Sequence, residues 1–169
     1  MKHTAVLFLL LAIASPAASQ AVDDKAVVPG TRIGRLALEM PIQDLMRMNG
    51  PASARPSTIA TFIPEATWVS WDSLGLAAGT HDKKRTDYLA VYQGSDYKTQ
   101  RGIGHKASRK AVVSAYGEPT VEGDIFVQGR IITILAYDRI GLAFFLYNDT
   151  VEVLLIFRPG ELVELIISC

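Results

Sequence analysis

Short apolar runs separated by turn residues fill the second half of the 169-residue chain. The runs are rich in β-branched and aromatic side chains, and glycine, asparagine, aspartate or proline stands between them. This alternation is typical of strands joined by tight turns, so it predicts an antiparallel meander. We expect its strands at 123–128, 130–137, 142–147, 151–157 and 162–167, with turns at Gly129, at Asn148-Asp149 and at 158–160.

The first half carries a weaker version of the same pattern, which predicts strands at 66–71, 74–79 and 88–93. Between the last two lies a charged turn at 81–87. The proline-containing stretch 51–65 predicts a loop or an edge segment, because proline cannot donate a ladder hydrogen bond.

A short helix precedes each group of strands. In the first, Pro41 stands at the first helical position and Asn49-Gly50 ends the helix. In the second, Ser108 can cap the start and Gly117 ends it. The expected apolar faces are Ile42, Leu45, Met46 and Met48 in the first helix, and Ala111, Val112 and Ala115 in the second.

Two pairs of segments recur at nearly the same spacing, which indicates an internal repeat. The segment 71–77 matches 137–143 at an offset of 66 residues, and 40–50 matches 107–117 at an offset of 67. We therefore expect two units, at about 30–97 and 98–169, each with a glycine-containing lead-in, a helix and strands. The fold class that follows is α+β: two tandem repeats, each a short helix followed by an antiparallel meander, in one layered domain. The helices are expected to cover one face of the sheet and to leave the other open to solvent.

The first residues have the pattern of a secretory signal peptide. Lys2 and His3 give a basic start, residues 5–14 are uncharged and apolar, and small residues follow Pro16. The apolar run is too short for a membrane-spanning helix, which needs ~20 residues. We expect residues 1–19 to be cleaved, with Ala21 as an alternative site, and residues 20–169 to form one extracytoplasmic domain, periplasmic or secreted, without a transmembrane segment.

Charge is balanced overall but unevenly placed along the chain. With 49% hydrophobic and 20% charged residues, the composition is that of a globular domain. The stretch 81–110 holds eight basic and three acidic residues, whereas 111–169 holds three basic and eight acidic ones. Neutral net charge and export argue against nucleic acid as a partner. The basic stretch suits a protein with an acidic surface or an anionic envelope component, the alternative being solvated loops.

A single cysteine, Cys169, excludes an intramolecular disulfide, so the fold must rest on its apolar core. The terminal thiol is expected to be free, and a disulfide between two chains is the alternative. Its isolation argues against a role as metal ligand or nucleophile.

No motif supplies a complete catalytic or cofactor-binding set, and no cofactor or metal is predicted. The segment 101–108 has two glycines and Lys106 before a helix, but it matches neither the dinucleotide fingerprint nor the P-loop. His81, beside Asp82, and His105 have no partners at metal-ligand spacing, and both are expected at the surface. Asp72 and Asp138 occupy equivalent places in the two units and are expected to fix turns, a paired-carboxylate site being the alternative.

Aromatic residues in the predicted strands, next to basic residues, are the candidate binding residues. Tyrosine and tryptophan on an open sheet are common interface anchors, although half-buried strand positions are the ordinary alternative. Trp68 and Trp71 should point to opposite faces of a strand, and Tyr88 and Tyr92 should share one. The candidate set is Trp71, Lys83, Lys84, Arg85, Tyr88, Tyr92 and Tyr137.

The helix-and-meander pattern resembles the tandem repeats of beta-lactamase-inhibitor-protein-like (BLIP-like) folds. It is also similar, in one repeat, to outer-membrane assembly lipoproteins of the SmpA/OmlA type. The resemblance is carried by 40–51 and by Gly102-Ile103 with 108–119, which are helix caps and core positions. It implies a secreted binding or scaffold domain with a concave sheet. Three features depart from those families: Glu39 and Lys106 stand where a glycine often precedes the helix, and both the inhibitor's disulfides and the lipidated cysteine are missing.

The sequence thus favours an exported, non-enzymatic binding domain that uses an open sheet face and a basic region to contact a protein or envelope partner. Two alternatives stay open. One is a small extracytoplasmic hydrolase or ligand-binding enzyme with a cleft between the repeats. The other is a structural envelope protein that self-associates.

Overall fold

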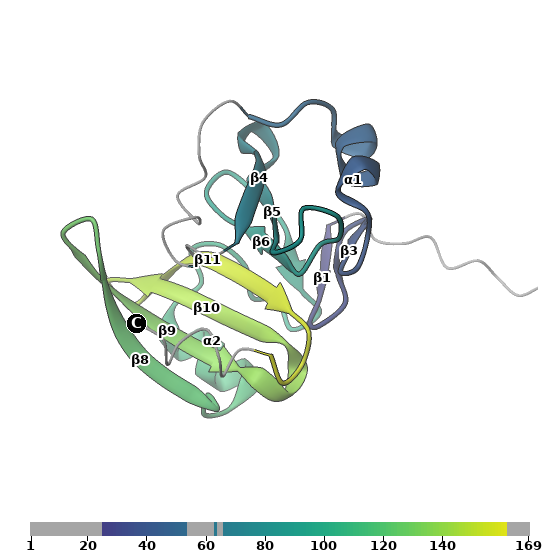
Figure 1. The fold of residues 1–169 in the computed structure, drawn as a ribbon. Helices are drawn as coiled ribbons and strands as arrows, with labels where there is room; N and C mark the ends of the chain where they lie inside the picture. The colour runs from purple at the N-terminus through teal and green to yellow at the C-terminus, as the bar shows by residue number, and fades with distance from the viewer. Residues whose placement is uncertain (1–24, 54–62, 64–65, 162–169) are drawn as a thin grey trace, which may run out of the picture.

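Strands dominate the part of the chain that the computed structural model describes, which is residues 25–53, 63 and 66–161. Within these ranges the fold is mixed α+β, with two α-helices and two sheets (Figure 1). The predicted signal peptide, most of the stretch 51–65, the predicted strand 162–167 and Cys169 lie outside the described residues.

The larger sheet has seven strands in the order β4-β5-β6-β11-β10-β9-β8, all paired antiparallel. The central pair, β6 and β11, joins strands far apart in sequence, with Leu154 opposite Val91 and Phe157 opposite Tyr88. The seven strands are β4 Thr67–Trp71, β5 Leu76–Thr80, β6 Tyr88–Val91, β8 Val121–Val127, β9 Arg130–Tyr137, β10 Leu142–Tyr147 and β11 Thr150–Phe157.

Most predicted strands of this sheet are confirmed. The bounds of β9 and β10 are those expected, and the predicted turn between β10 and β11 has Asn148 and Asp149 at φ of 48° and 57°. Positive φ at both central residues is the requirement of a type I′ hairpin turn. The prediction of a strand beginning at Leu74 is wrong, because Asp72–Leu74 forms a short 3-10 helix, η2, before β5.

A second, smaller sheet was not predicted. Its order is β3-β2-β1-β7, and β1 pairs parallel with β7. Strands of two or three residues are too short for an alternating pattern to show, so the glycine-containing lead-in segments gave no strand signal. The strands are β1 Ala26–Val28, β2 Arg32–Ile33, β3 Leu36–Ala37 and β7 Lys98–Thr99.

The two helices are α1, Ile42–Asn49, and α2, Arg109–Tyr116. Ser108 caps α2 as predicted, since its Oγ accepts a hydrogen bond from the backbone N–H of Ala111 at 3.2 Å. Pro41 lies at the cap of α1 and not at its first helical position.

Both helices end at a glycine with φ 79°, Gly50 and Gly117, a conformation in which only glycine avoids strain. The apolar face of α1 is narrower than expected. Ile42 and Leu45 are buried, whereas Met46 and Met48 are 40% and 47% exposed.

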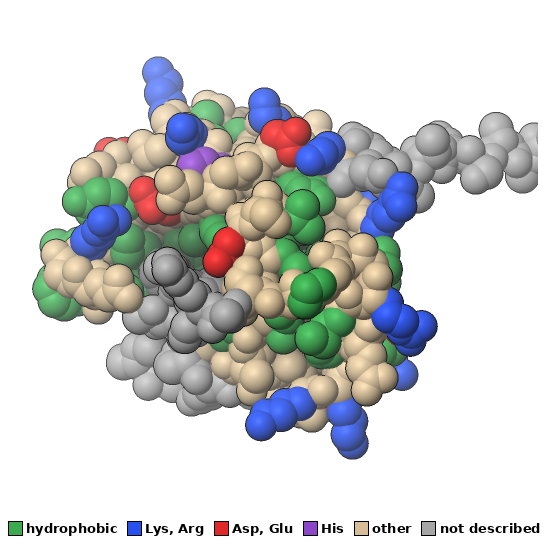
Figure 2. Space-filling model, turned by 90° about the horizontal axis from the view of Figure 1, so that it is seen from above, with side chains coloured by type: hydrophobic (Ala, Val, Ile, Leu, Met, Phe, Trp, Pro, Cys, Tyr) green, Lys and Arg blue, Asp and Glu red, His purple; other side chains and the backbone are tan. Residues whose placement is uncertain are grey.

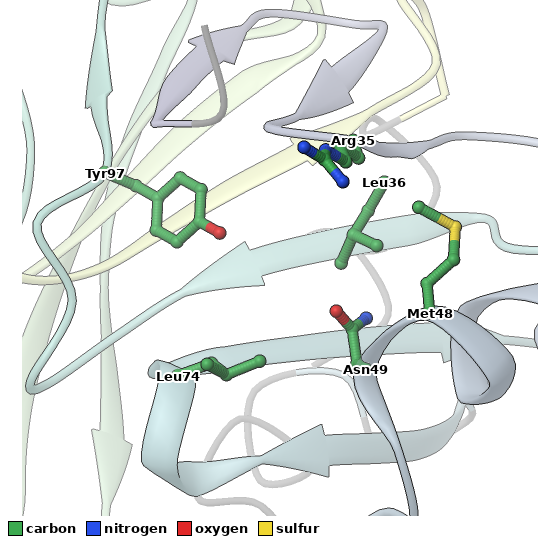
Figure 3. A pocket seen from close by; sticks show the side chains of 6 residues that line it. All are labelled: Arg35, Leu36, Met48, Asn49, Leu74 and Tyr97. Carbon is green, nitrogen blue, oxygen red and sulfur yellow. The ribbon is translucent and has the colours of Figure 1, made fainter.

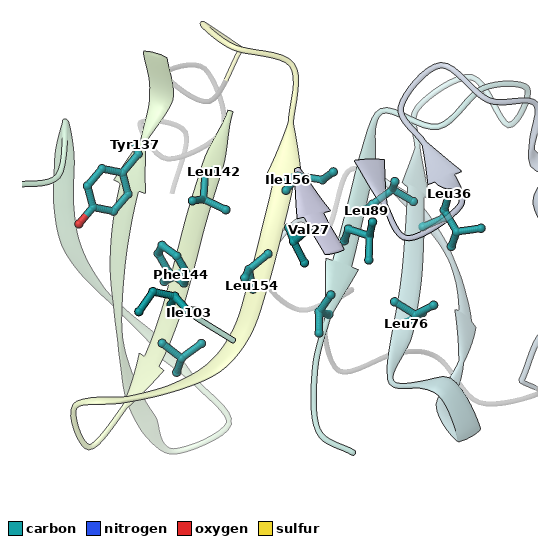
Figure 4. Packing of buried hydrophobic residues seen from close by; sticks show 14 of the residues in the cluster. Val27, Leu36, Leu76, Leu89, Ile103, Tyr137, Leu142, Phe144, Leu154 and Ile156 are labelled. Carbon is teal, nitrogen blue, oxygen red and sulfur yellow. The ribbon is translucent and has the colours of Figure 1, made fainter. Parts of the chain in front are cut away.

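The helices pack on one face of the large sheet, as predicted. The core on this side joins Leu45 of α1 and Val112 of α2 to side chains from β4 to β11 and from the small sheet. Figure 4 shows how Val27 and Leu36 of the small sheet lie beside Leu89, and how Phe144 and Leu154 continue the layer toward β9.

The opposite face of the sheet is also buried, so the expectation of an open face is wrong. Alternate residues of the central strands form a second apolar core, in which Ala90, Ala143, Leu155 and Phe157 are fully buried. The composition of the strands explains this burial. Every position of β10 is apolar or aromatic, which is typical of strands that are covered on both faces.

Two matching segments of the sequence adopt the same local structure. In each, a strand leads into a 3-10 turn, Asp72–Leu74 (η2) or Asp138–Ile140 (η3), which ends at a left-handed glycine, Gly75 or Gly141. The N–H of each glycine donates to the carbonyl of the aspartate that begins the turn, at 3.1 Å in both cases. At Gly141 no other residue fits, because an added Cβ would lie 2.1 Å from the carbonyl oxygen of Phe157.

Candidate functional site

Trp71 and Tyr137 lie in the helix-side core, which contradicts their predicted role as exposed anchors. Their exposed fractions are 2% and 5%. The Trp71 Nε1–H donates to the carbonyl of Gly50 at 3.0 Å, and the Tyr137 hydroxyl donates to the carbonyl of Gly117 at 2.9 Å. Each side chain therefore holds the end of a helix against the sheet.

Tyr88 and Tyr92 share the opposite face, and Trp68 points there while Trp71 points away, as predicted. Tyr88 is 3% exposed and its ring stacks with that of Trp68, at 6.0 Å between centroids. The Tyr92 hydroxyl donates to the carboxylate of Asp72 at 2.8 Å. Burial, and then this hydrogen bond, raises the pKa of Tyr92. Tyr88 is therefore a core side chain, and Tyr92 is half-buried against that core.

The basic residues of the candidate set are exposed together on one turn. We call residues 81–85 the basic turn; it joins β5 to β6. The side chains of Lys83, Lys84 and Arg85 face solvent. Lys and Arg side chains project around the margin of the face seen in Figure 2.

The exposed carboxylate of Asp82 organises the backbone of the basic turn. Its Oδ1 accepts the backbone N–H groups of Lys84 at 2.7 Å and Arg85 at 3.1 Å, and the hydroxyl of Thr80 at 3.2 Å. The two backbone N–H groups lower the pKa of Asp82. The carboxylate is therefore bonded to the backbone of the turn, and the basic residues Lys83, Lys84 and Arg85 are exposed.

The basic turn is fastened to the start of α1. The N–H of Ile42 donates to the carbonyl of Lys84 at 2.9 Å, and the Arg85 guanidinium donates to the carbonyl of Glu39 at 2.8 Å. The next residue, Thr86, is buried and bonds to the Met40 carbonyl through both its N–H and its hydroxyl. The turn is thus a fixed platform.

His81 pairs with Asp87 and not with its neighbour Asp82. Its Nδ1 lies 3.2 Å from Asp87 Oδ2. Asp87 in turn lies 3.5 Å from the guanidinium of Arg158, which also pairs with Glu39 and Glu161 at 2.8 and 2.9 Å. This ion-pair network ties the end of β11 to the start of β6.

His105 lines a pocket of about 460 Å³ together with Gln93, Lys106, Arg130 and the start of β11 at Thr150–Glu152. His105 is half-buried at the surface, and burial lowers its pKa. In the described part of the chain no hydrogen bond joins His105 to a hydroxyl or carboxylate, although Thr150 and Glu152 line the same pocket.

The glycine segment 101–108 is structural. The N–H of Thr99 donates to the carbonyl of Ile103 at 2.8 Å, which folds the segment into a hairpin with β7. A Cβ on Gly104 would lie 2.5 Å from the Tyr97 carbonyl oxygen, which explains the need for glycine. Arg109, at the start of α2, is paired with Glu122 at 2.8 Å.

A further pocket, of about 470 Å³, was not predicted from the sequence. Figure 3 shows side chains from four places surrounding it: the hairpin of β2 and β3, the last turn of α1, η2, and the residue before β7. Its lining residues are Arg35, Leu36, Met48, Asn49, Leu74 and Tyr97. The one signal for it in the sequence is the polar Asn49 beside Met48 at a helix end.

The described residues contain no group of three or more His, Cys, Asp and Glu side chains that could hold a metal ion. Among them there is also no helix with the length and apolar character needed to cross a membrane. Comparison of the chain with protein-family models, with curated proteins and with solved structures finds no match.

Proposed function

We propose that this chain is an exported, non-enzymatic binding domain that contacts an acidic segment of a partner protein through the basic turn. The observation that carries the proposal is the turn itself, in which the exposed carboxylate of Asp82 accepts two backbone N–H groups and three consecutive basic residues are exposed. A fixed platform of this kind loses little conformational freedom on binding, which favours affinity.

Electrostatics agree with an acidic partner. Lys83 and Lys84 have no carboxylate within ion-pair distance in the described residues, whereas nearby Arg158 is occupied by three carboxylates. Cations left at an exposed surface steer an oppositely charged partner and increase its rate of association. The aromatic candidates are not part of this surface, because Trp71, Tyr88 and Tyr137 are buried and Tyr92 is half-buried.

We also propose that the domain arose by duplication of a BLIP-like unit. Three observations support this. In the large sheet β4, β5 and β6 on one side of the β6–β11 pairing correspond in order to β9, β10 and β11 on the other, with β8 as an additional edge strand. The carbonyl of each helix-terminal glycine accepts a bond from an equivalent aromatic residue, and Glu39 and Lys106 both have positive φ, at 64° and 68°. Glu39 and Lys106 stand where BLIP-like and SmpA/OmlA-type proteins often have glycine, and glycine is the residue that best tolerates positive φ.

A charge-reversal experiment tests the binding proposal. The double variant Lys83→Glu/Lys84→Glu is compared with Lys110→Glu/Arg139→Glu, which changes the same charge at exposed positions elsewhere. We expect a labelled glutamate-rich peptide to bind the basic-turn variant about tenfold more weakly in low salt than the control, and the wild-type affinity to fall as salt is added.

Equal binding by the two double variants would remove the basic turn as the contact surface. Binding to vesicles of anionic phospholipid in preference to the peptide would replace the protein partner with a membrane surface. Circular dichroism of each variant ensures that a loss of binding is not a loss of fold. Export is tested separately, by the mass of the protein recovered from the extracytoplasmic fraction.

A further inference from the structure

The pocket that His105 lines lies at one end of the large sheet, where β6 stops and β9 and β11 begin. Neighbouring strands run antiparallel, so Gln93, which follows β6, reaches the same end as Arg130 and Thr150, the first residues of β9 and β11. We call this cavity of about 460 Å³ the sheet-end pocket. Three strand ends and the segment before α2 supply its side chains.

The backbone around the sheet-end pocket is fixed by hydrogen bonds. The N–H of Lys106 donates to the carbonyl of Val151 at 2.8 Å, and the N–H of Val151 donates to the carbonyl of Ala107 at 2.9 Å. These bonds join the segment before α2 to the start of β11. The Arg130 guanidinium lies over the Tyr147 ring, 4.8 Å from its centroid, a contact with the ring face that uses none of its N–H donors. The two cations of the lining therefore project from a fixed backbone.

A β-bulge places the one acidic side chain of the sheet-end pocket. Phe145 of β10 pairs with Val153 of β11. The next residue, Leu146, pairs with Val151, so Glu152 is an extra residue with no partner on β10. Bulges of this kind redirect a side chain away from its regular position in the sheet. Here the redirected side chain lines the pocket.

Opposite charges share the sheet-end pocket without pairing. Within the described residues, no ion pair or hydrogen bond joins the Glu152 carboxylate to Lys106 or Arg130, and all three residues are exposed, so a ligand can reach them. Burial, and then the charge of Lys106, lowers the pKa of His105, which leaves the imidazole uncharged at neutral pH. The lining therefore carries two positive charges and one negative charge.

We propose that the sheet-end pocket binds a small zwitterion with net negative charge, of which an acidic amino acid is the simplest case. Its two carboxylates accept hydrogen bonds from the Lys106 ammonium and the Arg130 guanidinium, and its ammonium group donates to the Glu152 carboxylate. Such a ligand mirrors the charges of the lining one for one. It also bridges the opposite charges that the protein leaves apart.

This proposal does not depend on the proposed function. The basic turn precedes β6, whereas the sheet-end pocket lies beyond the other end of that strand. Charge reversal at Lys83 and Lys84 should therefore leave binding in the pocket unchanged, and the two proposals can fail separately.

The test is an NMR titration of the full chain, at neutral pH and low salt, with L-glutamate, L-glutamine and glutarate. The backbone amide resonances of Lys106 and Glu152 report binding. We expect L-glutamate to bind about tenfold more tightly than L-glutamine, which lacks one carboxylate, and than glutarate, which lacks the ammonium group.

Two variants make the assignment specific. Lys106→Gln removes one cation and should weaken L-glutamate binding about tenfold, whereas Lys110→Gln, at an exposed position of α2, is the matched control and should bind as wild type does. Glu152→Gln should remove the preference for L-glutamate over glutarate, because the ammonium group loses its counter-charge. Glu118→Gln, also exposed, should keep that preference.

The proposal is overturned if L-glutamate leaves these resonances unshifted, or if L-glutamine or glutarate binds the wild type as tightly as L-glutamate does. Wild-type behaviour of Lys106→Gln or Glu152→Gln would overturn it as well. Both substituted residues are exposed, so the variants should fold, which circular dichroism verifies. If a variant did not fold, the ranking of the three ligands on the wild type would still test the proposal.

Discussion

The indole N–H of Trp71 donates a hydrogen bond to the carbonyl of Gly50, 21 positions earlier in the sequence. This bond holds the end of α1 against the face of the sheet. The hydroxyl of Tyr137 makes the corresponding bond to Gly117, 20 positions earlier, at the end of α2. Two different aromatic residues thus make the same interaction. Each donates a hydrogen bond to a carbonyl at a helix end, which has no partner within the helix.

Removing the Tyr137 hydroxyl should destabilise the domain without changing its packing. Tyr137→Phe keeps the ring and leaves the Gly117 carbonyl without this donor, so the free energy of unfolding should fall by about 1–2 kcal/mol. Trp71→Phe should cost more, because ring volume in the core is lost as well. Urea denaturation followed by circular dichroism measures both. An unchanged midpoint for Tyr137→Phe would show that the bond contributes nothing.

Gly141 should not tolerate a side chain. Alanine there must hold a left-handed φ of 65°, which costs about 1–2 kcal/mol, and its Cβ would lie against the Phe157 carbonyl of β11. Gly141→Ala should therefore lower the free energy of unfolding by more than about 2 kcal/mol.

Gly123→Ala, in β8, is the matched control, since no atom lies within 4 Å of an added Cβ there. It should change stability by no more than about 0.5 kcal/mol. Similar losses in the two variants would contradict the packing described for Gly141.

The basic turn should loosen in acid at a pH below the usual range for aspartate. The pKa of Asp82 is lowered from 3.8, so its bonds to the turn are fully present above that value. They are lost as pH falls through the lowered pKa, when the folded state must take up the proton. Amide hydrogen exchange at Lys84 and Arg85 measures this. Asp82→Ala should abolish the protection at neutral pH, whereas Asp124→Ala, in β8, should not. A titration midpoint for Asp82 at or above 3.8 would contradict the assigned bonds.

Alkaline conditions should destabilise the domain through its half-buried tyrosines. Burial raises the pKa of both Tyr92 and Tyr116 above 10.0. Above pH 10 the unfolded chain releases these protons while the folded chain keeps them, so stability is intact below pH 10 and is lost as pH rises through the raised pKa values. Absorbance titration of tyrosinate should show these residues ionising late. Tyr92→Phe should remove its share of the loss, and an unchanged alkaline profile in that variant would exclude the assignment.

How much of the fold is predictable from the sequence depends on the length of the element. Strands β9 and β10 have the predicted bounds because each carries a long apolar run between turn residues. The small sheet could not be predicted in this way, because a strand of two residues such as Arg32–Ile33, paired with β1 and β3, is too short to show an alternating pattern.

The candidate site was harder to predict, because the exposure of a strand side chain depends on what packs over its face of the sheet. Tyr88 and Trp71 alternate along their strands as interface residues would, yet both are buried. The continuous apolar character of 142–147 was the sign that neither face is open. The basic turn was predictable because charges crowded into a short turn cannot all be buried.

The pairing of β6 with β11 has a mechanical consequence. Four consecutive residues of each strand are joined there, from Leu154 opposite Val91 to Phe157 opposite Tyr88. A ladder of backbone hydrogen bonds cannot act as a hinge, since rotation about it would break the bonds one after another. The first three strands of the large sheet and the last four must therefore move as one body. We therefore expect association with a ligand or partner to proceed without closure of one half of the sheet upon the other.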